Sequence, residues 1–329
     1  MTMKNFLIFF VKLLISVGLC FLVWKSIVAT PGIESDDFWN IVKNIEYKHL
    51  FFAVLCIFLS YFSGCLQWKL LLASQNVVMT YINLFRFYLT GCFFNNFMPG
   101  NVGGDLKKIY DIKRNSEETV GAAVSATFLD RLCGLYVLCG LALLVGVAFF
   151  WEDPNHKYFL LPSLIVFLSF SFALCMLFSR RIGNLLFGKI LPFLGKRALH
   201  LHGRFQAFRT KRLFMQLFLL SMVTQSLRVI SHYFCALSIG VDISISWYFY
   251  YIPLIAIVSA LPISIGGFGP RELLAASLFG RVGVGAMEAV IMQLLAYGAN
   301  LLVSLLGVVE FLSKEIFSIF KRDSTGEKK

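Results

Sequence analysis

Charged residues are scarce in this sequence, and their scarcity excludes most classes of soluble protein. Only 15% of the 329 residues are charged, whereas soluble domains carry roughly 25%. Hydrophobic residues make up 58% of the chain, and the mean hydropathy is +0.76. These values predict an all-α, polytopic membrane protein.

Acidic residues are rarer than basic ones, which gives the chain a formal net charge of +12. The basic residues lie mainly in loops and tails that flank hydrophobic segments, as expected for a topology signal. No soluble region remains that could carry a nucleic-acid interface. Nucleic acid is therefore not expected as a partner.

Catalytic and metal-binding motifs are absent as well. None of the eight cysteines forms a CxxC pair, and all lie in apolar segments, which favours small core residues. His200 and His202 could hold a metal, but solvated loop histidines are the favoured interpretation. Walker, HExxH, GxSxG and paired-aspartate motifs do not occur. No catalytic residue, metal or cofactor is therefore predicted, and the chain is not expected to be an enzyme.

Long hydrophobic runs are abundant and predict the spans. The predicted spans are residues 6–28, 50–72, 119–150, 158–178, 213–239 and 287–312. The first is interpreted as an uncleaved helix rather than a signal peptide, because it is long and aromatic and contains Lys12. A single domain, 1–329, is expected, with halves 1–178 and 213–315 joined by the basic loop 179–212.

Two Pro/Gly breaks interrupt the hydrophobic pattern, and each has a proline followed four residues later by a Gly-Gly pair. Their residues are Pro99, Gly103 and Gly104 in the first break and Pro262, Gly266 and Gly267 in the second. Proline cannot continue a helix ladder, and glycine lets the backbone turn. The flanking apolar arms are shorter than the roughly 20 residues of a span. Each break is therefore predicted to form the tip of a re-entrant hairpin.

The two breaks lie at a constant spacing. Pro262 follows Pro99 at an offset of 163 residues (262 minus 99), and the Gly-Gly pairs share this offset. At the same offset Gln293 falls opposite Asp130. Halves that enter from opposite faces are typical of inverted-repeat transporters. The alternative, that proline and glycine mark two unrelated turns, stays open.

The distribution of charge agrees with two opposed hairpins. The N-terminus, the loops 107–114 and 180–212 and the C-terminal tail are predicted to be cytoplasmic. The acidic segment 34–37 and the short loops near residues 152, 242 and 281 then face outward. This arrangement requires that both Pro/Gly regions double back instead of crossing the membrane.

Ionisable residues inside apolar segments are the candidate site, because each costs on the order of 3 kcal/mol at the bilayer centre. The candidates for lipid headgroup binding are Asp105, Lys108, Asp130, Arg131, Arg271 and Glu272. Arg131, Lys108 or Arg271 would engage a phosphate, and the carboxylates would set charge preference. The alternatives are structural: an ion pair of Asp130 with Lys108 or Arg271 that locks the hairpins in place, and helix capping by Asp105. Arg228 is a further candidate that could instead snorkel.

Three motifs in this order resemble the lysylphosphatidylglycerol synthase transmembrane family, also called flippase-like. They are Pro99-Gly100-Asn101-Val102-Gly103-Gly104-Asp105-Leu106-Lys107-Lys108, Asp130-Arg131-Leu132 and Gly266-Gly267-Phe268-Gly269-Pro270-Arg271-Glu272. The resemblance covers nearly the whole chain. One departure is Lys108, where the family pattern leads us to expect arginine.

The resemblance implies a lipid flippase of the bacterial cytoplasmic membrane, in a stand-alone form without the soluble aminoacyl-transferase domain. The expected partners are membrane lipids: an anionic or aminoacylated phospholipid, or a polyprenyl-linked lipid. Assembly into a homo-oligomer is left open. The alternative functions are a membrane-embedded transferase for polyprenyl-phosphate or glycolipid substrates and an accessory protein that supports such an enzyme.

Overall fold

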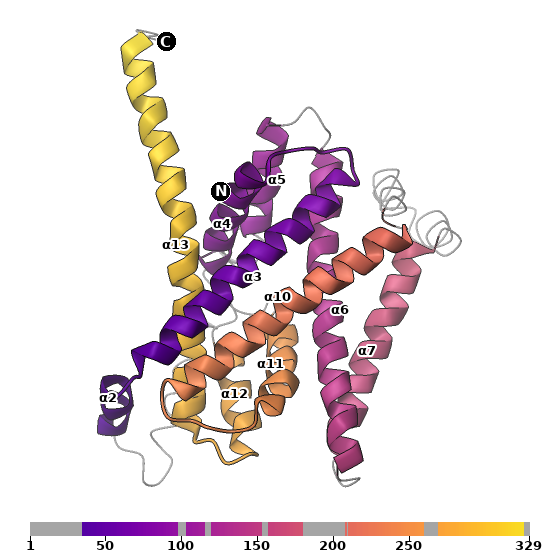
Figure 1. The fold of residues 1–329 in the computed structure, drawn as a ribbon, viewed down its shortest axis with the longest axis vertical. Coiled ribbons are helices and arrows are strands. Elements are labelled where there is room, and N and C mark those ends of the chain that lie inside the picture. Colours follow the sequence, from indigo (N-terminus) through magenta and orange to yellow (C-terminus); the bar gives the residue numbers. More distant parts are fainter. Residues whose placement is uncertain are drawn as a thin grey trace, which may run out of the picture.

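The computed structural model describes residues 35–97, 103–115, 120–152, 157–179, 208, 210–259 and 269–325. Every element in these ranges is a helix (Figure 1). The helices are α2 (Ser35–Lys43), α3 (Tyr47–Ala73), α4 (Tyr81–Phe97), α5 (Gly103–Asn115), α6 (Val120–Glu152), α7 (Lys157–Phe178), α10 (Lys211–Leu237), α11 (Ile245–Ser259), α12 (Pro270–Gly280) and α13 (Ala286–Thr325). The predicted all-α membrane fold is confirmed.

Within the described residues, four helices are long and apolar enough to cross a membrane: α3, α6, α10 and α13. They match the spans predicted over 50–72, 119–150, 213–239 and 287–312. Helix α7 occupies the segment predicted as 158–178, with a shorter apolar run at Leu160–Phe172. The span predicted over 6–28 lies outside the described residues, as does most of the basic loop 179–212.

Helices α3 and α10 cross antiparallel along most of their length (Figure 1). The Ser231 hydroxyl donates to the Ala53 carbonyl at 3.0 Å, and further along the Ser63 and Thr224 hydroxyls lie 2.8 Å apart. Small and hydroxyl-bearing residues let two membrane helices approach closely and bond across the interface. The crossing is therefore held by polar contacts within an apolar frame.

The helices of the second half repeat those of the first. Adding the offset of 163 to the first residues of α3, α4, α5 and α6 gives positions 210, 244, 266 and 283. Helices α10, α11, α12 and α13 begin at 211, 245, 270 and 286. The four-helix order of the first half therefore recurs in the second.

The ends of α3 and α10 also share one hydrogen-bond pattern. The Leu72 carbonyl accepts the amide of Val77 at 3.0 Å, and the Ala236 carbonyl accepts the amide of Val241 at 3.0 Å. In each turn the residue before that valine has positive φ: Asn76 at 64° and Gly240 at 79°. This is the left-handed closure typical of helix C-termini. Here the offset is 164, one more than between the breaks.

The two halves are oppositely oriented. In Figure 1 the pair α4–α5 lies in the upper part of the molecule and the pair α11–α12 in the lower part, and α6 and α13 run in opposite directions. The halves are also interleaved, because α4 packs on α13 and α11 packs on α6. The helices of each half are therefore packed in part against helices of the other half.

The four hairpin helices are short. Helices α4 and α5 have 17 and 13 residues, and α11 and α12 have 15 and 11. At 1.5 Å per residue the longest extends about 25 Å, less than the roughly 30 Å hydrocarbon core. Each predicted re-entrant hairpin therefore corresponds to a pair of short helices. Pro99, Pro262, Gly266 and Gly267, predicted at their tips, lie outside the described residues.

Candidate functional site

The first hairpin is closed by backbone contact between its two arms. A Cβ on Gly104 would lie 1.8 Å from the Gly91 carbonyl oxygen, so only glycine fits at this crossing. The Asn95 side chain accepts the Gly104 amide at 2.8 Å. Asn95 on the first arm therefore bonds one of the free amides at the start of α5. Asn95, and not Asp105, is therefore the residue that caps this helix start.

Asp105 instead pairs with Arg131. Its carboxylate accepts the Arg131 guanidinium across the interface between α5 and α6. Asp105 stands in the first turn of α5, where a negative charge is favoured by the helix dipole. The Asp105 side chain is 14% exposed and the Arg131 side chain 37% exposed. The pair is thus partly accessible, and it ties the hairpin to a span.

Asp130 is held by a polar chain through three spans. The Gln67 amide of α3 donates to the Asp130 carboxylate at 2.9 Å. The Ser221 hydroxyl of α10 donates to the Gln67 side-chain oxygen at 2.8 Å. Gln67 and Ser221 are buried, so these bonds form in a region that water barely reaches. The two orienting residues, Gln67 and Ser221, were not predicted; their signal was a polar side chain in an apolar segment.

Lys108 lies on aromatic rings rather than in an ion pair. Its ammonium is 3.8 Å from the Tyr88 ring centroid and 5.4 Å from that of Trp68. Only 4% of Lys108 is exposed. Cation–π contacts of this kind strengthen when the cation is desolvated. In the described residues no carboxylate lies within ion-pair distance of the Lys108 ammonium.

Charged groups converge around Asp130. The groups that act on it electrostatically are Lys108, Asp105, Arg228 and Arg131. Arg228 of α10 also acts on Tyr61 and Tyr88, which places it where α3, α4 and α10 meet. Four of the predicted site residues therefore gather with Arg228 into one group, which we call the Asp130 cluster: Asp105, Lys108, Asp130, Arg131 and Arg228.

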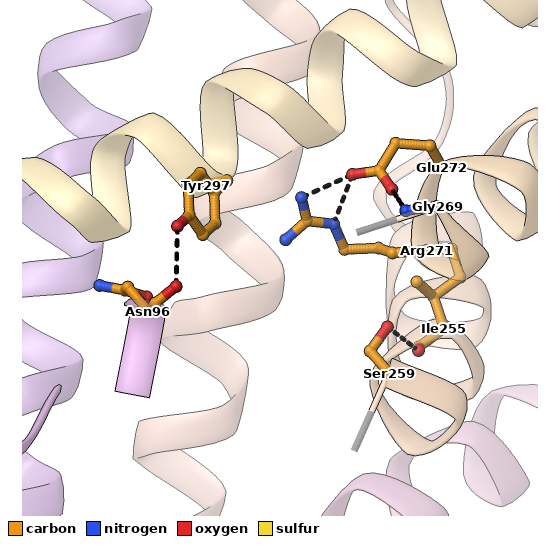
Figure 2. Close-up of polar contacts among 7 residues, drawn as sticks. All are labelled: Asn96, Ile255, Ser259, Gly269, Arg271, Glu272 and Tyr297. Atoms are coloured by element: carbon orange, nitrogen blue, oxygen red, sulfur yellow. Dashed lines mark hydrogen bonds and ion pairs between the residues drawn. The ribbon is translucent and has the colours of Figure 1, made fainter. Parts of the chain in front are cut away.

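Arg271 and Glu272 form a separate pair at the start of α12 (Figure 2). Gly269, with φ of 92°, precedes Pro270 at the first helical position. The Glu272 carboxylate reaches back to accept the Gly269 amide at 2.7 Å. Its other oxygen accepts two bonds from the Arg271 guanidinium, at 3.0 and 2.6 Å. The sequence motif Gly-Pro-Arg-Glu thus builds a helix start that neutralises its own charges.

A polar seam joins the second half to the first hairpin. The Arg271 guanidinium lies 5.3 Å from the Tyr297 ring centroid. The Tyr297 hydroxyl donates to the Asn96 carbonyl at 3.3 Å (Figure 2). The Asn96 side chain accepts the Asn300 amide and donates to the Ser304 hydroxyl, both at 3.0 Å. Helix α13 therefore carries a row of polar residues that binds the end of α4.

The repeat places chemically related residues at matched positions. Arg271 lies 163 residues after Lys108, and both are cations on the second arm of a hairpin. The Lys108 ammonium lies over the Trp68 ring. The ends of α3 and α10 are related by an offset of 164, and at this offset Trp68 matches His232. Arg271 acts electrostatically on His232. In each half a hairpin cation therefore acts on a ring-bearing residue of the crossing helix, although Arg271 lies over the Tyr297 ring instead.

Taken together, fold and site define a polytopic helical membrane protein with two oppositely oriented halves and ionisable residues where hairpins meet spans. The chain matches the family of the lysylphosphatidylglycerol synthase TM region over residues 9–307. It belongs to this family. A search of curated proteins found no match. Membership supports a lipid-related function in a membrane, and it confirms the resemblance carried by the three motifs.

Proposed function

We propose that this protein moves a phosphate-bearing lipid between the two leaflets of the bacterial cytoplasmic membrane, without catalysing a reaction. The observation that carries the proposal is the Asp130 cluster. Asp130 is ten residues from the start of α6, or about 15 Å along the helix, within a helix long and apolar enough to cross a membrane. Charges at that depth are costly and are retained for a function such as headgroup passage.

The hairpins supply the mobile boundary in this proposal. We propose that α4–α5 and α11–α12 are re-entrant and enter from opposite faces, as in transporters built from inverted repeats. The headgroup would pass along the polar residues between them while the acyl chains stay in lipid. The Asp105–Arg131 pair ties one hairpin to a span, so exchange of this pair for a lipid phosphate would couple binding to hairpin movement.

The proposed orientation follows the basic residues. The ends of α5 and the start of α10 carry Lys113, Arg114, Lys211 and Arg212, and in Figure 1 both lie in the upper part of the molecule. Loops near positively charged helix ends tend to be cytoplasmic. We therefore propose that this face, together with the C-terminal end of α13, is cytoplasmic.

Leaflet exchange in liposomes tests the proposal. The purified protein is reconstituted with headgroup-labelled anionic and aminoacylated phospholipids, and exchange between leaflets is measured. We expect acceleration by the unaltered protein and its loss in Asp130→Asn and Arg131→Ala. Lys113→Gln removes an exposed charge outside the cluster and is the matched control. Absence of acceleration for every bacterial lipid tested would reject the proposal.

The transferase alternative gives a different result in the same liposomes. A transferase would convert its lipid substrate into a product of different mass, and the change would be seen by mass spectrometry of the extracted lipids. A translocator returns every lipid chemically unchanged. Conversion of a lipid without its exchange between leaflets would reject the proposal and support the transferase alternative.

A further inference from the structure

Arg228 is a charged side chain that the contacts described so far do not neutralise. It is half-buried in α10, and no salt bridge or side-chain hydrogen bond joins it to the described residues. Its electrostatic partners are Tyr88, Tyr61, Cys92 and Asp130. It stands nine residues before the end of α10, about 14 Å along the helix. A position this deep leaves little room for snorkelling to an interface.

The Asp130 cluster carries one positive charge in excess. Its cations are Lys108, Arg131 and Arg228, and its anions are Asp105 and Asp130. The neighbouring pairs Lys107–Asp111 and Arg271–Glu272 are each neutral. The hairpin tips, residues 98–102 and 260–268, contain no ionisable side chain. A buried excess charge is unfavourable unless a counter-ion is bound.

The surface that would bind an ammonium group is already occupied. Aromatic faces are the usual partners of cationic headgroups, and here the faces of Tyr88 and Trp68 hold the ammonium of Lys108. A headgroup that carries its own cation would compete with Lys108 and would raise the excess charge. An anionic headgroup would compensate the charge and leave the rings as they are.

We propose that Arg228, together with Lys108, binds the phosphate of a lipid that is net anionic and has no cationic group. This inference rests on the proposed function, because it names the lipid class for the same site. Both cations act electrostatically on Cys92, so both face the same part of the interface between α4 and its neighbours. A guanidinium offers paired donors to phosphate oxygens, and an ammonium adds a point charge.

Lipid binding to the detergent-purified, full-length protein tests the inference separately from transport. Native mass spectrometry compares phosphatidylglycerol, phosphatidylethanolamine and lysylphosphatidylglycerol, whose headgroups carry net charges near −1, 0 and +1. We expect phosphatidylglycerol to bind at least tenfold more tightly than the lysyl lipid. A fourth arm with a polyprenyl phosphate distinguishes a phosphomonoester from a phosphodiester ligand.

Substitutions of Arg228 test whether this residue binds the lipid phosphate. Arg228→Gln should lower phosphatidylglycerol affinity at least tenfold and abolish the preference over phosphatidylethanolamine. Arg228→Lys should retain affinity within about threefold of the unaltered protein, and Lys113→Gln should change nothing. If Arg228→Gln does not fold, the inference is still tested by the order of the lipid affinities of the unaltered protein and by the affinity of Arg228→Lys. Preference for the lysyl lipid, or an unchanged affinity in folded Arg228→Gln, would overturn the inference.

Exchange measured with the same lipids separates this inference from the proposed function. Selective, Arg228-dependent binding without leaflet exchange would support the assigned site and reject translocation. Exchange of the lysyl lipid with no preference for phosphatidylglycerol would support translocation and reject the assigned lipid class.

Discussion

Asp130 in the first half and Gln293 in the second occupy matched positions, but their surroundings differ. Asp130 accepts a bond from Gln67 and is approached by three cations. Gln293 is fully buried beside His232, and its amide forms no hydrogen bond of normal geometry with the described residues. One half therefore places a charge where the other places a neutral amide.

The hairpin cations differ in the same way. Arg271 is neutralised by its neighbour Glu272, within one turn of α12. Lys108 lies on aromatic rings and forms no ion pair with the described residues. A repeated frame can thus carry a charged centre in one half and a neutral one in the other. Under the proposed function, an anionic lipid would be drawn to the first half, and the second half would serve as its neutral counterpart.

The largest expected effect tests whether the two hairpins are built alike. Gly104→Val forces atoms into the Gly91 backbone, and overpacking of this kind should destabilise the protein by about 3 kcal/mol. Thermal unfolding in detergent measures the loss. Gly267, at the matched position, should respond to the same substitution by a similar amount.

Gly280→Ala is the control for this pair, because a Cβ there meets nothing within 4 Å. A Gly104→Val protein as stable as Gly280→Ala would contradict the close crossing. A large loss at Gly104 with none at Gly267 would restrict the crossing to the first hairpin.

The second prediction concerns the self-neutralised helix start. Glu272→Gln keeps the size of the side chain but removes the charge that accepts Arg271 and the Gly269 amide. Hydrogen bonds to charged groups contribute about 2 kcal/mol each, and we expect a loss of stability of about this size. Thermal unfolding should show it, whereas Glu152→Gln, at the exposed last residue of α6, should unfold like the parent.

The Asp105–Arg131 pair should matter less for stability than for transport. It is partly exposed, so either single neutral variant, Asp105→Asn or Arg131→Gln, should cost about 1 kcal/mol. Leaflet exchange should fall at least tenfold in both. The double variant separates the alternatives: a purely structural pair regains full activity when both charges are removed together, whereas a binding pair does not.

The smallest effect is expected at the neutral centre. Gln293→Leu replaces a buried amide by an apolar side chain of similar size and should change stability by no more than about 1 kcal/mol, in the stabilising direction. Chemical denaturation of both proteins measures the difference. A strong destabilisation would show that this amide is bonded, and the contrast with Asp130 would then lie in charge alone.

Much of the fold followed from the sequence. Hydrophobic length predicted the four spans, and the spacing of Pro99 and Pro262 predicted an offset that the helix starts follow to within four residues. These features are local, because each depends on a short window of residues. The opposed orientation followed from charge, since basic and acidic loops alternate along the chain.

The hydrogen-bond and ion-pair partners of the site residues did not follow from the sequence, because they depend on contacts between distant segments. Helix capping was the structural alternative for Asp105, but Asn95 takes that role and Asp105 pairs with Arg131. Asp130 was considered a partner of Lys108 or Arg271; Lys108 is near it but lies on rings. The match of Trp68 with His232 was missed because it needs an offset of 164.

The interleaving of the two halves has a consequence for biosynthesis. Helix α4 packs closely on α13: a Cβ on Gly307 would lie 2.4 Å from the Leu89 backbone, and Thr90 bonds the Gly307 carbonyl at 3.2 Å. A ribosome makes α4 long before α13, and segments fold as they emerge. The first hairpin must therefore wait in the membrane, where α3 and α6 are the described helices that it packs against. A nascent chain halted at Ser179 would present that unfinished surface to membrane proteases, and its half-life should be far shorter than that of the completed protein.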